Sequence, residues 1–365
     1  MSEITLLAEV TAFLRQPHGQ FIAGQREAGR GAPFAVINPA TGRAIAEVTA
    51  ADSDQADRAM ESARQAFSQW REMPTLARGA LLLKLADTLA EHREALAQLE
   101  SLCSGKTITL ARMLELDQSV AFLRYFAGWA GKVTGETLDV SLPSMAGEKY
   151  TAFTRRQPLG VVVGIVPWNF SIMIAIWKLA AALVCGCTIV LKPSEYTPLT
   201  LLRVAELAKA VGIPDGVINV VNGAGGEIAQ RLITHPACAK VSFTGSVATG
   251  EKVQQSASAS GKRVTLELGG KNAALFLDDL TPEAMVNGII EAGYLNQGQI
   301  CAAAERFYLP QGKLDAVLAE KADIVEETTE TPPQTPERET PPATNEPEER
   351  KEEEEENKKE EQPAR

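Results

Sequence analysis

The chain has 365 residues, 45% of them hydrophobic, a length and composition that suggest about two packed domains. Of its formal net charge of −11, residues 322–365 contribute −10, because they hold 16 Asp+Glu and 6 Lys+Arg. The other residues carry 31 acids and 30 bases, a net of −1, and this balance argues against a nucleic-acid partner.

The cysteines and histidines favour a reducing compartment. Five cysteines are an odd number without a Cys-x-x-Cys pair, and the three histidines are widely separated. We therefore expect no disulfide framework, no metal site and no Ser-His-Asp triad, and predict a cytoplasmic location. The N-terminus lacks the basic start and apolar run of a signal peptide, and the apolar stretches are too short to span a membrane.

Apolar residues recur at helical spacing in the first part of the chain. Helices are predicted over residues 51–72, 75–103 and 109–132. The third helix has four aromatic residues on one stripe, which we expect to be core rather than a binding site: Phe122, Tyr125, Phe126 and Trp129. Residues 1–133 are interpreted as the N-terminal helical part of a cofactor-binding domain.

From residue 158 short apolar runs alternate with helical segments. Strands are predicted over residues 161–166, 188–191, 217–221 and 240–243, and helices over residues 172–185, 198–211 and 227–233. Strands rich in Val and Ile that alternate with helices form βαβ units, with a parallel sheet covered on both faces. The sequence therefore predicts a Rossmann-like, doubly wound α/β core over residues 158–268. Residues 134–157 are predicted to form a β-hairpin arm.

The end of the chain changes in composition. A short helix is predicted over residues 313–321. Residues 322–365 hold seven prolines, no aromatic residue and a run of five glutamates. Such a segment buries too little apolar surface to offset the entropy of ordering it, so we predict a disordered acidic tail.

Cys301 is the candidate nucleophile. A free cysteine is more often a small buried hydrophobe, but the small residues around Cys301 indicate an approachable thiol. A thiol that attacks a carbonyl needs a group that manages protons, and the carboxylate of Glu267 is a candidate from a separate loop. The alternative for Glu267 is a solvated carboxylate at a strand end. Gly269 and Gly270 follow it and favour close approach of a ligand to the backbone.

Polar residues also follow the predicted strands, at the edge where open α/β sheets bind ligands. Asn169 stands there, where it can cap the next helix. Gly245 and Ser246 end one strand and open a helix whose N-terminus can hold a pyrophosphate. Lys192 and Glu195 follow another strand, in a position suited to a ribose. A carboxylate there favours NAD, whereas the lysine is compatible with the extra phosphate of NADP.

Five segments, in this order, resemble motifs of the aldehyde dehydrogenase superfamily. They are Pro167-Trp168-Asn169-Phe170, Lys192-Pro193-Ser194-Glu195, Phe243-Thr244-Gly245-Ser246, Thr265-Leu266-Glu267-Leu268-Gly269-Gly270-Lys271 and Gly298-Gln299-Ile300-Cys301. The resemblance covers residues 1 to about 320. Within the superfamily, residues 164–170 and 295–302 are most similar to bacterial phenylacetaldehyde dehydrogenases.

The resemblance implies NAD-dependent oxidation of an aldehyde, phenylacetaldehyde-like, to a carboxylic acid. It makes Cys301 the nucleophile that forms a thiohemiacetal and then a thioester. Glu267 is the implied base that activates water, with burial raising its pKa toward neutrality, and Asn169 the implied donor to the oxyanion. The residues implied to bind the cofactor are Trp168, Lys192, Ser194, Glu195, Gly225, Phe243, Gly245, Ser246, Leu268 and Gly269.

The chain departs from the family pattern after the cysteine. Family members continue with a Glu-containing Phe-Gly-Pro motif, a segment that lines the substrate tunnel and a strand that pairs with the arm of a neighbouring subunit. No Phe-Gly-Pro occurs here. We therefore expect residues 269–321 to form a truncated catalytic domain with unpaired sheet edges and exposed apolar faces. The family is homo-oligomeric, and the strand that pairs with the arm is expected to be missing from this chain.

Three alternatives to an active enzyme stay open. The chain is a non-catalytic descendant that binds NAD or pairs with a full-length relative, an interaction protein whose acidic tail recruits basic partners, or an artefact in which the C-terminal half was replaced.

Overall fold

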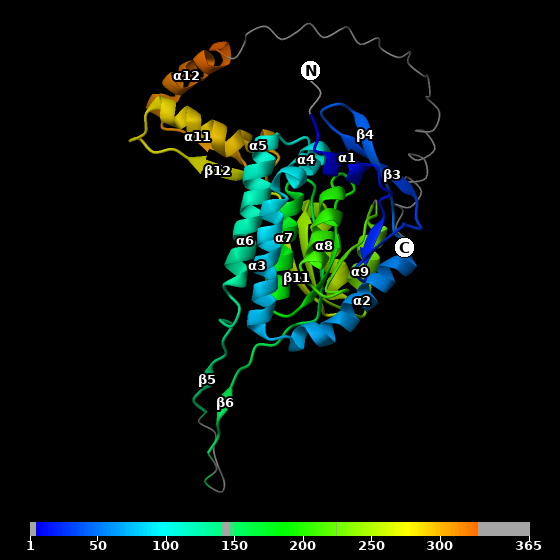
Figure 1. Cartoon of the computed structure of the whole chain (residues 1–365). Coiled ribbons are helices and arrows are strands. Elements are labelled where there is room, and N and C mark those ends of the chain that lie inside the picture. The colour runs from blue at the N-terminus through cyan, green and yellow to red at the C-terminus, as the bar shows by residue number, and fades with distance from the viewer. Residues whose placement is uncertain (1–4, 141–146, 148, 224, 328–365) are drawn as a thin grey trace, which may run out of the picture.

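The computed structural model describes residues 5–140, 147, 149–223 and 225–327. A seven-stranded sheet with the strand order β11-β10-β7-β8-β9-β1-β2 forms the centre of the body (Figure 1). Its strands are β1 (Gln20–Ile22), β2 (Gln25–Glu27), β7 (Val161–Ile165), β8 (Thr188–Lys192), β9 (Ile218–Val220), β10 (Cys238–Gly245) and β11 (Arg263–Leu268). Strands β7 to β11 run parallel, which confirms the predicted doubly wound sheet.

Helices cover both faces of this sheet, because side chains along each strand point alternately to the two faces. In β7, Val162 packs into one core, whereas Val161 and Val163 pack into the other. Helices α7 (Ser171–Val184) and α8 (Leu199–Ala210) belong to the first core. Helices α2 (Ser53–Glu72), α9 (Glu227–Thr234) and α10 (Val247–Ser258) contribute to the second.

The prediction of one long helix over residues 75–103 is wrong. This segment is two helices, α3 (Thr75–Glu91) and α4 (Arg93–Ser104), separated at His92, whose φ of −92° and ψ of 14° depart from helical values. The helix predicted over residues 109–132 consists of α5 (Ile108–Leu110), a π-helix η1 (Ala111–Asp117) and α6 (Gln118–Ala127). Helix α6 ends five residues before the predicted end, at residue 127 rather than 132.

The aromatic stripe of α6 is only partly core. Phe122 and Phe126 are half-buried and pack against the first core. Tyr125 and Trp129 are 59% and 43% exposed, so their predicted burial is wrong. A stripe at helical spacing shows which residues share a face, but not whether a second element covers that face.

Strands before residue 50 were missed by the sequence analysis, which described this part as helical. After α1 (Ala8–Leu14), the chain forms β1 and β2 at one edge of the large sheet. A separate antiparallel pair follows, β3 (Pro33–Asn38) and β4 (Arg43–Thr49). β1 joins the sheet by pairing Phe21 with Val220 of β9, an antiparallel contact that a local pattern does not encode.

The predicted hairpin is present in the chain between the N-terminal helices and the Rossmann-like core. Strands β5 (Thr137–Leu138) and β6 (Ala152–Phe153) pair antiparallel and extend away from the body (Figure 1).

The segment after β11 is a small α/β unit. It consists of β12 (Asn272–Leu275), α11 (Pro282–Tyr294), η2 (Leu295–Gly298), β13 (Ala304–Tyr308), η3 (Gln311–Lys313) and α12 (Leu314–Glu327). In the described part of the chain, β12 and β13 pair only with each other. Leu275, Leu277 and Tyr308 are exposed, which confirms the prediction of bare apolar surface. Helix α12 runs past residue 321, so predicted disorder is wrong for residues 322–327; residues 328–365 lie outside the described residues.

Across the described ranges, no helix combines the length and the apolar character needed to cross a membrane.

Candidate active site

A cavity of about 790 Å³ lies at the carboxyl ends of the parallel strands β7, β8, β10 and β11. The chain reverses its winding direction between β7 and β10, and ligands bind at such a point in open α/β sheets. The cavity lining contains every site residue predicted from the sequence: Trp168, Asn169, Lys192, Ser194, Glu195, Gly225, Phe243, Gly245, Ser246, Glu267, Leu268, Gly269 and Cys301.

Cys301 reaches this cavity from a tightly bent loop. Asn296, Gln297 and Gly298 have φ values of 51°, 56° and 75°, and such left-handed conformations are unusual for residues other than glycine. The side-chain amide of Asn272 donates to the carbonyl oxygen of Cys301 at 2.6 Å. The loop is therefore held in one bent conformation, and Cys301 is exposed, as an attacking thiol requires.

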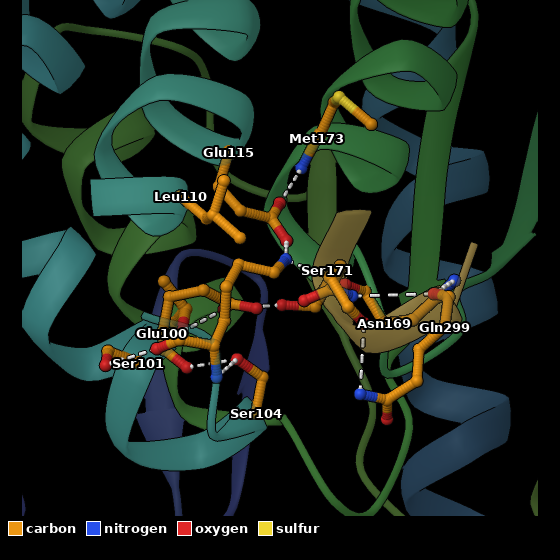
Figure 2. Close-up of polar contacts among 12 residues, drawn as sticks. Glu100, Ser101, Ser104, Leu110, Glu115, Asn169, Ser171, Met173 and Gln299 are labelled. Atoms are coloured by element: carbon orange, nitrogen blue, oxygen red, sulfur yellow. Dashed lines mark hydrogen bonds and ion pairs between the residues drawn. The ribbon is translucent and has the colours of Figure 1, made fainter. Parts of the chain in front are cut away.

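Asn169 binds the same loop. Its side-chain Nδ2 donates to the carbonyl oxygen of Gln299 at 2.8 Å (Figure 2). The cap position of α7 is occupied by Phe170, without a side-chain hydrogen bond, so the helix-cap alternative for Asn169 is wrong. Because an amide nitrogen carries two hydrogens, Asn169 can bind the loop and still donate to a ligand oxygen.

Glu267 lies near the end of β11, opposite Thr244 of β10, and is exposed. The predicted burial of this carboxylate is therefore wrong in this chain. A second cavity of about 410 Å³ is lined by Glu267, Cys301 and the buried Lys178. Lys178 Nζ donates to Thr244 Oγ1 at 2.8 Å and to Ser242 Oγ at 3.0 Å.

Burial lowers the pKa of Lys178 to about 8, while the carboxylate of Glu267 acts in the opposite direction. Lys178 was not predicted as a site residue from the sequence. A lysine inside an otherwise apolar helix was the available signal, because a buried amine needs polar partners. Lys178 thus places a titratable amine beside Glu267, the candidate base.

The N-terminus of α10 opens onto the larger cavity. Ser246 caps the helix, with its Oγ accepting from the backbone N–H of Thr249 at 3.3 Å. A Cβ atom on Gly250 would lie 2.6 Å from a methyl carbon of Leu268, so glycine allows α10 to pack closely on β11. The partial positive charge of a helix N-terminus suits a phosphate group.

Lys192 is the last residue of β8, and Glu195 follows three residues later. Lys192 is buried and its Nζ donates to the carbonyl oxygen of Pro193 at 3.1 Å. Burial lowers the pKa of Lys192, and the half-buried Glu195 opposes this shift. Glu195 is thus the more accessible of the two charges in this part of the cavity.

Residues that were not predicted as site residues also line the larger cavity. They are Ile165, Val166, Pro167, Ile174, Tyr196, Gly226, Ala229, Thr244, Thr249, Lys252, Val253, Gly298, Gln299 and Ile300. Ala229 and Val253 come from α9 and α10 and give the cavity an apolar wall, which suits a planar base.

Known proteins are similar to this chain over most of its length. The sequence model of the aldehyde dehydrogenase family matches residues 26–365. A phenylacetaldehyde dehydrogenase of Pseudomonas fluorescens is 44% identical over 316 residues, which are 86% of this chain and 63% of that protein. Retinaldehyde dehydrogenase 3 of Homo sapiens is 42% identical over 289 residues, 78% of this chain and 55% of that protein. The chain thus spans less than two thirds of the length of these relatives.

Solved structures agree with this similarity. The NAD+ complex of an aldehyde dehydrogenase from Bacillus cereus has a TM-score of 0.84 and 40% identity, covering 88% of this chain and 65% of that one. Betaine aldehyde dehydrogenase from Staphylococcus aureus in complex with NAD+ has a TM-score of 0.81 and 35% identity, covering 88% and 63%.

Proposed function

This chain belongs to the aldehyde dehydrogenase family, and from that premise we propose that it oxidises an aldehyde to a carboxylic acid with NAD as cofactor. The observation that carries the proposal is that Cys301, Asn169 and Glu267 line one cavity at the carboxyl edge of the sheet. A nucleophile, an oxyanion donor and a base are the groups required for oxidation through a thioester.

Cys301 forms the first bond. Its thiolate sulfur attacks the carbonyl carbon of the aldehyde, a C–S bond forms, and negative charge develops on the carbonyl oxygen. The side-chain amide of Asn169 and the backbone N–H of Cys301 donate to that oxygen. When bound, NAD supplies the acceptor for the hydride that leaves the carbonyl carbon. Loss of this hydride converts the thiohemiacetal on Cys301 into a thioester.

Glu267 completes the reaction as general base. It removes a proton from a water molecule, whose oxygen then attacks the thioester carbonyl carbon. The C–S bond breaks, the carboxylic acid leaves, and the sulfur of Cys301 is released as thiolate. The exposed position of Glu267 supports this role, because water has direct access to its carboxylate.

The larger cavity fits a dinucleotide. The N-terminus of α10, which Ser246 caps beside Gly245, suits the pyrophosphate. Glu195 suits the 2′-hydroxyl of the adenosine ribose and disfavours the extra phosphate of NADP. Lys192 is compatible with that phosphate, because its ammonium group keeps two hydrogens beside the one that it donates to the Pro193 carbonyl. NAD is the proposed cofactor, and NADP is an alternative.

An apolar aldehyde with an aromatic side chain is the proposed substrate. The smaller cavity meets Cys301 and is walled by Leu159, Ile174 and Trp177, which suit an aryl group. The similarity to a phenylacetaldehyde dehydrogenase supports the same class of substrate.

The thioester provides a direct test. A Glu267→Gln variant lacks the base, so incubation with NAD and phenylacetaldehyde should leave an acyl group on Cys301. Peptide mass spectrometry should locate this added mass, and hydroxylamine should remove it. Acylation that depends on NAD and is absent from Cys301→Ala supports the proposal; an unmodified Cys301 in folded, NAD-saturated protein contradicts it.

A second candidate is a chain that binds NAD without turnover. The exposed apolar side chains of the unit after β11 favour it, because a small core of Met285, Val286 and Val317 gives that unit limited stability. This candidate predicts NAD binding by calorimetry with no acylation of Cys301.

Two further proposals concern the oligomeric state and the cellular location. The β5–β6 hairpin is proposed as an oligomerisation arm, and sedimentation velocity of a variant lacking residues 137–153 tests it. A cytoplasmic location is proposed because all five cysteines, each in the described residues, are free.

A further inference from the structure

A buried group of charged residues lies behind the candidate active site. Lys106 follows α4, Glu100 lies on α4, and Glu115 lies on the π-helix η1. Their exposed fractions are 1%, 0% and 0%. Lys106 Nζ donates to Glu115 Oε1, so an amine and a carboxyl group are hydrogen-bonded to each other inside the protein. Charges at this depth are costly unless they are paired and hydrogen-bonded, so the group needs an explanation.

Lys106 and Glu115 both contact the segment that carries the candidate oxyanion donor. Lys106 Nζ donates to the backbone carbonyl oxygen of Asn169 at 2.7 Å and lies 3.9 Å from the ring centroid of Phe170. The carboxylate of Glu115 accepts from the backbone N–H of Met173 at 2.9 Å (Figure 2). The Lys106–Glu115 pair therefore holds the segment at two backbone positions and one side chain.

Glu100 holds the same segment from the other side. Its Oε2 accepts from Ser171 Oγ at 2.7 Å and from Thr200 Oγ1 at 3.0 Å. Residues 169–173 are thus bound by three buried side chains that come from a different part of the sequence. Figure 2 shows the contact of Glu115 with Met173 and the contact of Glu100 with Ser171.

We propose that Lys106 and Glu115 are positioning residues that hold the backbone of Asn169 so that its side-chain amide faces the Cys301 loop. The inference rests on the proposed function, in which this amide stabilises the oxyanion. An oxyanion donor must be fixed before charge develops, and a small displacement of a catalytic group is costly. The contact of Lys106 with the Asn169 carbonyl lies directly beside the side chain to be fixed.

The test compares two reactions of Cys301 in a Cys185→Ser background, because Cys185 is the other exposed cysteine. In the first, the thiolate attacks p-nitrophenyl acetate, a C–S bond forms through an oxyanion, and the C–O bond breaks to release nitrophenolate. In the second, the thiolate displaces iodide from iodoacetamide, and no oxyanion forms on the attacked carbon. Only the first reaction depends on the position of Asn169.

The main variant is Lys106→Met with Glu115→Leu, which removes both partners together. Replacement of a buried Lys–Glu pair by apolar residues is often tolerated, whereas loss of one partner leaves the other polar group buried alone. The matched control is Arg112→Met with Glu94→Gln, which removes a partly exposed ion pair that joins η1 to α4. Circular dichroism confirms that each variant is folded.

The expected result for Lys106→Met with Glu115→Leu is acylation slower by about 100-fold, the scale of losing one oxyanion donor, with unchanged alkylation. In an Asn169→Ala background the same pair should produce no further slowing, and the Arg112 control should acylate at the normal rate.

Three other results overturn the inference. Equal slowing of acylation and alkylation indicates a general change at the thiol. Normal acylation in the pair variant, while Asn169→Ala is slow, refutes positioning and leaves the proposed function intact. Normal acylation in Asn169→Ala itself refutes the oxyanion role and the inference together.

Discussion

The pH dependence of stability provides a quantitative prediction from the buried charges. Burial raises the pKa of Glu115 to about 8 from an ordinary value of 4.5; the carboxylate of Glu100 raises it further, and Lys106 lowers it. Between these two pH values, the folded state holds a proton that the unfolded state has lost. The free energy of unfolding should therefore be highest below pH 4.5 and fall as the pH rises through 8.

The size of the effect follows from the shift. A difference of one bound proton changes the free energy of unfolding by about 1.4 kcal/mol per pH unit. Over the window from 4.5 to about 8, the contribution of Glu115 is thus at most about 5 kcal/mol. Glu115→Gln resembles the protonated acid in shape and cannot ionise, so this variant should lose the pH dependence that Glu115 causes.

Urea unfolding, followed by tryptophan fluorescence at pH 5, 6, 7 and 8, measures the difference in the free energy of unfolding between Glu115→Gln and the unmodified chain. The difference should be small at pH 5, and Glu115→Gln should become the more stable protein by a few kcal/mol at pH 8. Glu251→Gln, which alters an exposed carboxylate on α10, is the control and should follow the unmodified chain. Parallel stability curves for Glu115→Gln and the unmodified chain would refute the reasoning.

Three further predictions concern the cofactor and the fold. Glu195→Ala should weaken NAD binding about tenfold in calorimetry while NADP binding is retained, because a charge-assisted hydrogen bond is lost; equal losses for both cofactors would count against the ribose contact. Gly186→Ala should lower the free energy of unfolding by roughly 1–2 kcal/mol, because its φ is +81° and a Cβ would lie 2.9 Å from a proline ring. Gly312→Ala, with open space around it, should change stability little in the same urea titration. Trp70→Phe should cost about 1–3 kcal/mol, because it removes the 3.2 Å hydrogen bond to the Leu183 carbonyl and opens a cavity; an unchanged urea midpoint would contradict this.

The large sheet could be predicted from the sequence because its strands are buried on both faces. Runs such as residues 161–166 are continuously apolar, and the helices between them have clear periodicity. The breaks inside the predicted helices have no comparable pattern in the sequence. His92 is neither glycine nor proline, and the π-helical turn around Glu115 has nearly the same apolar spacing as an α-helix.

The site was predictable as a set of residues but not in its supporting contacts. The motif residues come together because strand ends of a parallel sheet share one edge. The exposure of Glu267 and the contact of Asn169 with Gln299 depend on tertiary packing over 130 positions of sequence. Lys106 and Glu115 belong to no recognised pattern, and only the structure places them beneath Asn169.

The proposed activity is oxidation of an aldehyde by NAD through a thioester on Cys301. The most direct measurement is the absorbance of NADH with purified protein, NAD and phenylacetaldehyde, compared with Cys301→Ala. The account predicts steady NADH production by the unmodified chain and none by the variant. Absence of NADH from folded protein that binds NAD, or equal production by Cys301→Ala, would contradict it.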